Sequence, residues 1–238
     1  MAKDATHFHF KRFSIRHDRA TMKVGTDSVL LGTWTDVGRA RSILDIGTGS
    51  GIIALMLAQR TSPETSIHGV EIDVENVEQA RENVRLSPWP EKVKLFHTAI
   101  QDFKAPNRYD LIVSNPPYFK NSLQPPDERR RQARHTTQLA HEELLQCVAK
   151  LLDERGEFSV VLPHQSEQAF ISLASNQHLY CTRQWSFRTR STKKVERWLL
   201  TFTRRQETPE QGQILLYAEG NTWSEGYRSL TRDFYTIL

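Results

Sequence analysis

The sequence predicts an α/β fold, a doubly wound and mostly parallel seven-stranded sheet that ends in an antiparallel hairpin. Three observations lead to this fold class. Short apolar runs alternate with stretches whose apolar residues recur at helical spacing. A glycine-rich turn follows the first run, as it does in open α/β sheets that bind ligands. The last two strand-like runs are joined by a turn too short to hold a helix.

The apolar runs define the strands of the parallel part. Strands buried on both faces of a sheet appear in sequence as nearly continuous apolar runs. Such runs are found at residues 42–46, 67–72, 93–97, 109–113 and 158–162. Because helical patterns separate them, the strands are expected to be parallel, with helices on both faces of the sheet.

Two residues indicate where the intervening helices begin and end. Asp73 stands immediately before the helical pattern of residues 74–84 and is placed to cap its first turn. Gly156 follows the apolar face formed by residues 144–152 and is expected to end that helix.

The remaining strands and the chain ends complete the predicted organisation. A parallel crossover needs a dozen or more residues, so residues 180–187 and 195–203 are expected to pair antiparallel. No repeat or long linker divides the chain, and we expect one domain over residues 1–238. Within it, residues 1–25 would be a small N-terminal β appendage and residues 206–238 a C-terminal extension.

Composition excludes several classes of protein. Of the 238 residues, 38% are hydrophobic and 25% charged, which argues against disorder and against a fibrous repeat. The longest apolar run, Ile52–Ala58, is too short to cross a bilayer, and the N-terminus lacks an apolar signal segment. Cys147 and Cys181 form no CxxC pair, and no histidines have metal-ligand spacing. We therefore expect a cytoplasmic protein with no metal and no membrane partner; the oligomeric state is not predicted.

The glycine turn is typical of a nucleoside site. Residues 44–51 contain the spacing G-x-G-x-G, whereas a dinucleotide fingerprint would place a third glycine at Ile52. Glu71 ends the second strand, where a carboxylate can accept hydrogen bonds from both ribose hydroxyls. Asp102 follows the third strand, within reach of an adenine amino group. The competing interpretations are a turn that only packs and carboxylates that are only solvated.

A second motif, Asn115-Pro116-Pro117-Tyr118, directly follows the fourth strand. An amino group conjugated to a ring or carbonyl is a poor nucleophile because its lone pair is delocalised. The Asn115 side-chain oxygen and the Pro116 carbonyl can accept its two N–H groups and free the lone pair. The prolines hold these acceptors rigid, and Tyr118 offers a face for stacking. The structural alternative is a Pro-Pro turn that closes a strand.

Together these motifs resemble the class I S-adenosyl-L-methionine-dependent methyltransferases that carry an NPPY motif. Four further stretches point to one family within this class. They are residues 10–13, 17–19 and 22–32 near the N-terminus and residues 230–235 in the tail. They are similar to the bacterial tRNA1(Val) adenine-N6 methyltransferase family, which modifies the adenosine 3′ of the anticodon. The resemblance covers nearly the whole chain and implies a Rossmann-like methyltransferase fold.

The resemblance also implies site residues. Those expected to bind the cofactor S-adenosyl-L-methionine are Lys23, Gly25, Thr26, Asp27, Asp45, Gly47, Gly49, Glu71, Asp102 and Asn115. Those expected to act on the target base are Asn115, Pro116, Pro117 and Tyr118. Thr26 has an alternative role as a helix N-cap.

Charge points to the substrate. The net charge is +4, and residues 183–205 hold eight lysines and arginines against Glu196 alone. Such runs are commonly solvated surface. Beside an amino-group site, however, they would form a phosphate-binding rim for tRNA. The residues concerned are Arg129, Arg130, Arg131, Arg134, Arg188, Arg190, Lys193 and Lys194.

The sequence therefore predicts a methyltransferase acting on the exocyclic N6 of an adenosine in tRNA. A protein glutamine-amide methyltransferase is the nearest alternative, since an amide nitrogen poses the same lone-pair problem. DNA adenine or ribosomal RNA targets are further alternatives. A non-catalytic RNA-binding module comes from a different functional class.

Overall fold

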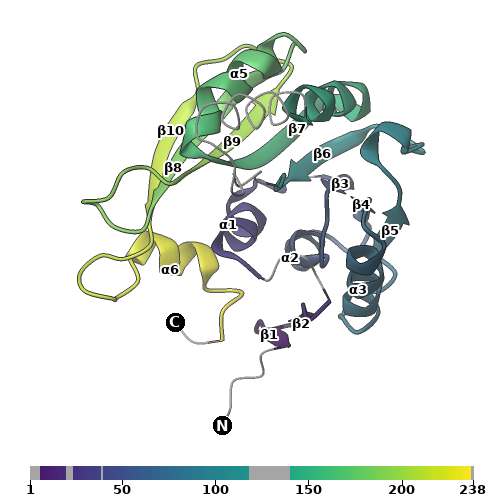
Figure 1. Ribbon diagram of the computed structural model, residues 1–238, viewed down its shortest axis with the longest axis horizontal. Helices are drawn as coiled ribbons and strands as arrows, with labels where there is room; N and C mark the ends of the chain where they lie inside the picture. The colour runs from purple at the N-terminus through teal and green to yellow at the C-terminus, as the bar shows by residue number, and fades with distance from the viewer. Residues whose placement is uncertain (1–5, 20–23, 39, 118–139, 237–238) are drawn as a thin grey trace, which may run out of the picture.

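An eight-stranded sheet forms the centre of the computed structural model, which describes residues 6–19, 24–38, 40–117 and 140–236 (Figure 1). The strands lie in the order β10-β8-β9-β7-β6-β3-β4-β5. Their bounds are β3 Ser42–Ile46, β4 Ser66–Glu71, β5 Val93–His97, β6 Tyr109–Ser114, β7 Leu152–Pro163, β8 Tyr180–Arg188, β9 Arg197–Thr203 and β10 Glu210–Leu215.

The sheet confirms the predicted fold class and contains one strand more than predicted. Strands β5, β4, β3, β6 and β7 are parallel to one another, and β9 is antiparallel to both β7 and β8. The additional strand, β10, overlaps the strand-like run at residues 214–217 of the sequence and pairs parallel with β8. A Cβ atom on Gly212 would lie 2.3 Å from Trp185 Cε2, so the glycine leaves room for the indole across this edge.

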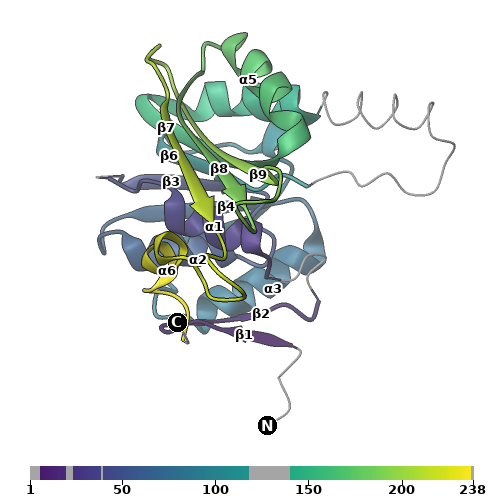
Figure 2. The ribbon, with the colours of Figure 1, turned by 90° about the vertical axis from the view of Figure 1, so that its left-hand side faces the viewer.

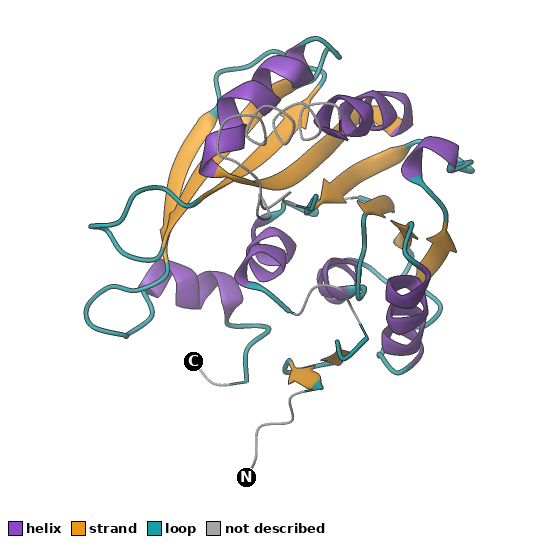
Figure 3. Cartoon of the chain, viewed as in Figure 1, coloured by secondary structure: helices purple, strands orange, loops and turns teal. Residues whose placement is uncertain are grey.

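Helices cover both faces of the sheet (Figures 1 and 3). One face carries α1 Thr26–Trp34, α2 Ile52–Arg60, α3 Val74–Arg85 and α6 Glu225–Thr231; the other carries the helical residues 140–151 and α5 Glu167–Ser175. Each face buries its own hydrophobic core, which is the pattern expected of a doubly wound sheet. Within the described ranges, no helix combines the length and apolar character needed to cross a membrane.

One predicted helix end is wrong. The helix ends at residue 151, and β7 runs from Leu152 to Pro163 with Gly156 inside it. The glycine is required there by packing rather than by a helix cap. A Cβ atom at this position would lie 2.8 Å from the Tyr109 carbonyl oxygen of the neighbouring strand.

The side chains of Asp73 and Asn83 hold α3 in place beside the glycine turn. Asp73 caps α3 as predicted, accepting a hydrogen bond from the Asn76 amide at 2.8 Å. Asn83 of α3 donates to the carbonyl oxygens of Ser50 in the turn and of Arg16, both at 2.9 Å. The side chain of Asn83 thereby ties α3, the turn and the N-terminal hairpin together.

The N-terminal hairpin packs against the C-terminal segment (Figure 2). Its strands, β1 His7–His9 and β2 Ser14–Arg16, pair antiparallel. Phe10 is buried, and its ring centre lies 6.2 Å from that of Phe234 and 6.1 Å from that of Tyr235. The Lys11 amide donates to the Phe234 carbonyl at 2.7 Å. Residues more than two hundred positions apart therefore share one aromatic cluster.

Candidate active site

A cavity of about 620 Å³, here called the first cavity, opens at the carboxyl ends of β3, β4 and β6. Parallel sheets bind ligands at this edge. Its wall includes Ser28, Gly47, Gly49, Glu71, Gln101, Asn115 and Pro117.

The glycine turn supplies a backbone wall to the first cavity. Gly47, Gly49 and Gly51 have φ of 72°, 55° and 82°, a region that side chains disfavour. No atom lies within 4 Å of the Cβ position of Gly47 or Gly49, so both glycines face open space. The amides of Gly47 and Thr48 donate to the Val70 carbonyl at 2.9 and 3.1 Å. The turn therefore presents a fixed backbone surface that a ligand can approach closely.

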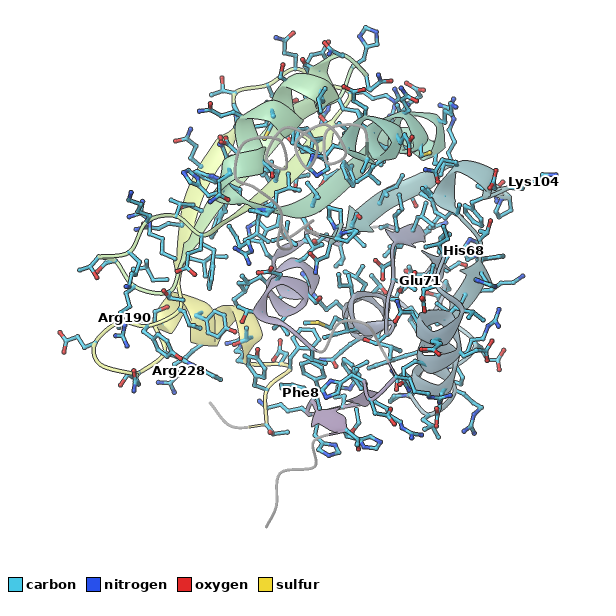
Figure 4. The ribbon with its side chains drawn as sticks, viewed as in Figure 1. Phe8, His68, Glu71, Lys104, Arg190 and Arg228 are labelled. Carbon is cyan, nitrogen blue, oxygen red and sulfur yellow. The ribbon has the colours of Figure 1, made fainter. Side chains whose placement is uncertain are left out.

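Glu71 lies where the sequence places it, at the end of β4 and in the wall of the first cavity (Figure 4). Its carboxylate accepts hydrogen bonds from the amides of Gly49 and Asp73, each at 2.9 Å. These two bonds fix the orientation of the Glu71 carboxylate in the cavity wall.

Asp45 lies behind the glycine turn and not among the residues lining the first cavity. Its side chain is completely buried and accepts from Thr48 Oγ1 at 2.6 Å and from the Ala54 amide at 3.2 Å. Burial raises the pKa of this carboxyl group to about 7, against the opposing effect of both hydrogen bonds. Asp45 therefore supports the turn from beneath.

Asp102, predicted to lie near the adenine, is also not among the residues that line the first cavity. Asp102 belongs to the short 3-10 helix Ile100–Asp102, and it is exposed. Its neighbour Gln101 lines the first cavity instead, and the Gln101 amide nitrogen donates to Glu143 at 2.9 Å.

The Asn-Pro-Pro turn lies at the junction of three cavities. Asn115 lines the first cavity and a second cavity of about 250 Å³. Pro116 lines a small cavity of about 140 Å³, and Pro117 lines both the small and first cavities. The Ser114 hydroxyl donates to the Ile46 carbonyl at 2.9 Å and anchors the turn to β3. Tyr118 lies outside the described residues.

Ser28 is a site residue that the sequence analysis missed. Its hydroxyl oxygen accepts a hydrogen bond from Asn115 Nδ2 at 3.1 Å. Since the amide group is planar, this contact determines the direction in which the Asn115 oxygen points. The two residues are 87 positions apart, and no local motif signals the contact.

The N-terminal residues assigned to the cofactor line the second cavity. Gly25, Thr26 and Asp27 all belong to its wall, as does Ser28. Gly25, rather than Thr26, is the N-cap residue of α1. Asp27 accepts a hydrogen bond from Arg197 Nε of β9 at 2.8 Å. Lys23 lies outside the described residues.

The basic hairpin between β8 and β9 reaches the same edge of the sheet, because β8 is parallel to β7. Arg188 is half-buried, and Lys193 and Lys194 are exposed. Arg190 instead donates to Gly220 and Asn221 of the C-terminal loop. Arg129, Arg130, Arg131 and Arg134 lie outside the described residues.

Comparison with known proteins identifies the family. The family model "Methyltransferase small domain" matches residues 19–180. A "tRNA1(Val) (adenine(37)-N6)-methyltransferase" of Bacteroides thetaiotaomicron is 44% identical over 231 residues, which are 97% of this chain and 98% of the relative. A relative of the same name from Yersinia pestis (strain Pestoides F) is 47% identical over 96% of this chain and 93% of its own length. The chain belongs to the tRNA1(Val) (adenine(37)-N6)-methyltransferase family.

Solved structures support the methyltransferase fold. A predicted O-methyltransferase from Agrobacterium tumefaciens superposes with a TM-score of 0.66 at 15% identity, covering 87% of this chain and 96% of that chain. A ribosomal protein L11 methylase from Lactobacillus delbrueckii superposes with a TM-score of 0.54 at 18% identity, over 75% of this chain and 78% of that chain.

The first cavity fits the cofactor of this family, S-adenosyl-L-methionine. The open backbone at Gly47 and Gly49 allows close approach of a ligand without a Cβ clash. Glu71 is held in place beside it by two backbone amides, and a carboxylate is a group that can accept from hydroxyls. This combination of a bare glycine wall and a fixed carboxylate is the chemistry that a nucleoside requires.

Proposed function

We propose that this protein transfers the methyl group of S-adenosyl-L-methionine to N6 of adenosine 37 in tRNA1(Val). The observation that carries the proposal is the position of Asn115, in the wall between a cavity suited to a nucleoside and a second cavity. Similarity to family members over nearly the full length supports the same substrate.

Glu71 and the glycine turn would hold the donor in the first cavity. S-adenosyl-L-methionine supplies an electrophilic methyl group on a sulfonium. The protein must therefore make the acceptor amine nucleophilic and align it, rather than activate the donor.

Asn115 and Pro116 act on the acceptor amine. The Asn115 side-chain oxygen and the Pro116 carbonyl oxygen each accept one N–H, which draws the exocyclic nitrogen away from conjugation with the ring. The two prolines fix the backbone, so these acceptors need little reorganisation during the reaction. No strong base is required, because the nitrogen loses its proton as or after it gains the methyl group.

The basic hairpin binds the tRNA backbone in this proposal. Lys193 and Lys194 are exposed at the same edge of the sheet as Asn115 and can contact phosphates. The target base leaves its stack to reach the site, as it does in other enzymes that modify bases. The expected location of the protein is the cytoplasm, together with its tRNA substrate.

Methylation of unmodified cellular tRNA tests the proposal. Wild-type protein with radiolabelled S-adenosyl-L-methionine should yield labelled N6-methyladenosine after digestion and chromatography. Asn115→Ala should lose at least about a hundredfold in rate while retaining cofactor binding, because it removes an acceptor aimed at the reacting nitrogen. Label in protein glutamine instead of tRNA would contradict the proposal, and so would full activity of Asn115→Ala.

A further inference from the structure

Helix α3 buries a row of polar side chains. Asn76, Gln79 and Asn83 follow one another at helical spacing, and they are 9%, 0% and 2% exposed. Asn76 lines the first cavity, whereas Gln79 and Asn83 lie outside its wall. A buried amide group is costly unless its donor and acceptor atoms are paired. The partners of Gln79 and Asn83 therefore show what this face of α3 holds in place.

Asn83 uses both ends of its side-chain amide. Its Oδ1 atom accepts a hydrogen bond from the Arg16 amide at 2.9 Å. Its Nδ2 atom donates to the carbonyl oxygens of Arg16 and Ser50, each at 2.9 Å. Because the amide is planar, the three bonds hold Arg16 and Ser50 in fixed directions around one side chain. An apolar replacement would leave three backbone groups without these partners.

Residues 16–19, here called the docked segment, are held on α3 by further bonds. Gln79 accepts from the Arg19 amide at 3.1 Å. Glu82 accepts from the guanidinium groups of Arg16, at 3.0 Å, and of Arg19. These ion pairs are partly exposed, and such pairs contribute little to stability. The buried amides of Gln79 and Asn83 are therefore the contacts that fix the docked segment.

The docked segment and the glycine turn lead to two parts of the wall of the first cavity. His17 is buried, and its Nδ1 atom accepts from the amide of Val24, the residue before the N-cap of α1, at 3.4 Å. Helix α1 carries Ser28, which lines the first cavity, and Ser50 of the glycine turn lines the same cavity. Asn83 is therefore bonded to both segments without lining the cavity itself.

We propose that Asn83 is a positioning residue for the methyl donor, holding the glycine turn and the docked segment together before S-adenosyl-L-methionine binds. This inference rests on the proposed function only in placing the donor in the first cavity. Without the Asn83 amide, a fraction of the folded molecules has both segments in place, and the apparent donor affinity falls by that fraction. Saturating donor restores the arrangement, because it binds the ordered state better.

Donor binding by an Asn83→Ala variant tests this role. The dissociation constant of S-adenosyl-L-methionine, measured by isothermal titration calorimetry, should rise by about tenfold, and KM for the donor should rise with it. The kcat at saturating donor should stay within about twofold of the wild-type value. Ser159→Ala is a matched control, since it removes a buried hydrogen bond to Thr201, between β7 and β9, and should bind the donor normally.

Two results with these variants would overturn the inference. One is the opposite division of the kinetic constants, a lower kcat for Asn83→Ala with an unchanged dissociation constant for the donor. The other is an equal loss of donor affinity in Ser159→Ala, because the effect would then come from general destabilisation rather than from the two segments that Asn83 joins.

Hydrogen exchange of the wild-type protein provides a test that does not depend on variant folding. The amides of Arg16 and Arg19 donate to side chains of α3, and neither residue lines the first cavity. Saturation with S-adenosyl-L-methionine should slow their exchange by about fivefold or more, together with that of the glycine turn, because the donor binds the closed arrangement. Slower exchange at the glycine turn alone would overturn the inference. Failure to methylate tRNA, with both segments protected by the donor, would instead contradict the proposed function.

Discussion

The side-chain amide of Asn115 has an acceptor and a donor end, and only the acceptor can attract the hydrogens of an amine. The hydrogen bond from Asn115 Nδ2 to Ser28 therefore has a chemical consequence as well as a structural one. In the proposed reaction, this bond favours the orientation that presents the Asn115 oxygen to the substrate amine. We therefore expect Ser28 to be a positioning residue that acts through Asn115.

Ser28→Ala should reduce kcat of tRNA methylation by about tenfold, which corresponds to one neutral hydrogen bond. KM for tRNA should change little, because the bond orients an acceptor and does not hold the RNA. Ser28→Thr keeps a hydroxyl and should restore most of the rate, while Ser175→Ala on the distant α5 serves as a control. Equal kcat for Ser28→Ala and the wild-type protein would contradict this role.

Asp45 makes stability depend on pH. Because burial raises its pKa in the folded protein to about 7, the folded state keeps a proton that the unfolded chain releases at lower pH. The contribution to stability is present in acid and is lost as pH rises towards 7. Between pH 5 and pH 8, wild-type protein should lose about 2–3 kcal/mol more unfolding free energy than Asp45→Asn. Urea unfolding at both pH values measures this difference, and parallel pH dependences would refute it.

At the level of elements, the basic side chains of the hairpin of residues 189–196 have two different surroundings. Arg190 contacts the C-terminal loop and stacks over the Tyr217 ring, with 5.0 Å from Cζ to the ring centre. Lys193 and Lys194 extend from the surface. Arg190 therefore holds the hairpin in place, and the lysines are available to RNA.

Replacing both Lys193 and Lys194 by Gln should weaken tRNA binding and reduce the slope of log affinity against log salt by about 1.5–2. The reduction follows from losing two phosphate contacts. Cofactor affinity should stay constant. Lys104→Gln is a matched control, since Lys104 and the hairpin residue Arg190 lie at opposite ends of the molecule (Figure 4). An unchanged salt slope for the double variant would rule out the contacts.

Individual elements also show which structural features the sequence predicts and which it does not. Apolar runs predicted the parallel strands, and Asp73 predicted the start of α3, because both signals depend on neighbouring residues. Gly156 was interpreted as a helix end, although a neighbouring strand is what requires it. The contacts of Ser28 with Asn115 and of Asp27 with Arg197 join residues 87 and 170 positions apart. Such pairs depend on the folded topology, which local patterns do not encode.

For the molecule as a whole, the two chain ends stabilise one another. Phe10 is 4% exposed and packs among Phe13, Phe234 and Tyr235. Phe10→Ala should destabilise the protein by roughly 3–5 kcal/mol, the usual cost of removing a buried aromatic ring. Thermal unfolding would measure this loss. A change below about 1 kcal/mol would show that the cluster contributes little to stability.

The two parts of the aromatic cluster are synthesised at different times. Phe8 and Phe10 are synthesised more than two hundred residues before Trp223, Tyr227 and Tyr235, which complete the cluster. At about 5–20 residues per second, this delay lasts roughly 10–45 seconds. For that interval the rings of Phe8 and Phe10 lack the C-terminal partners of their cluster, so the hairpin reaches its final packing only after residue 235 has been made.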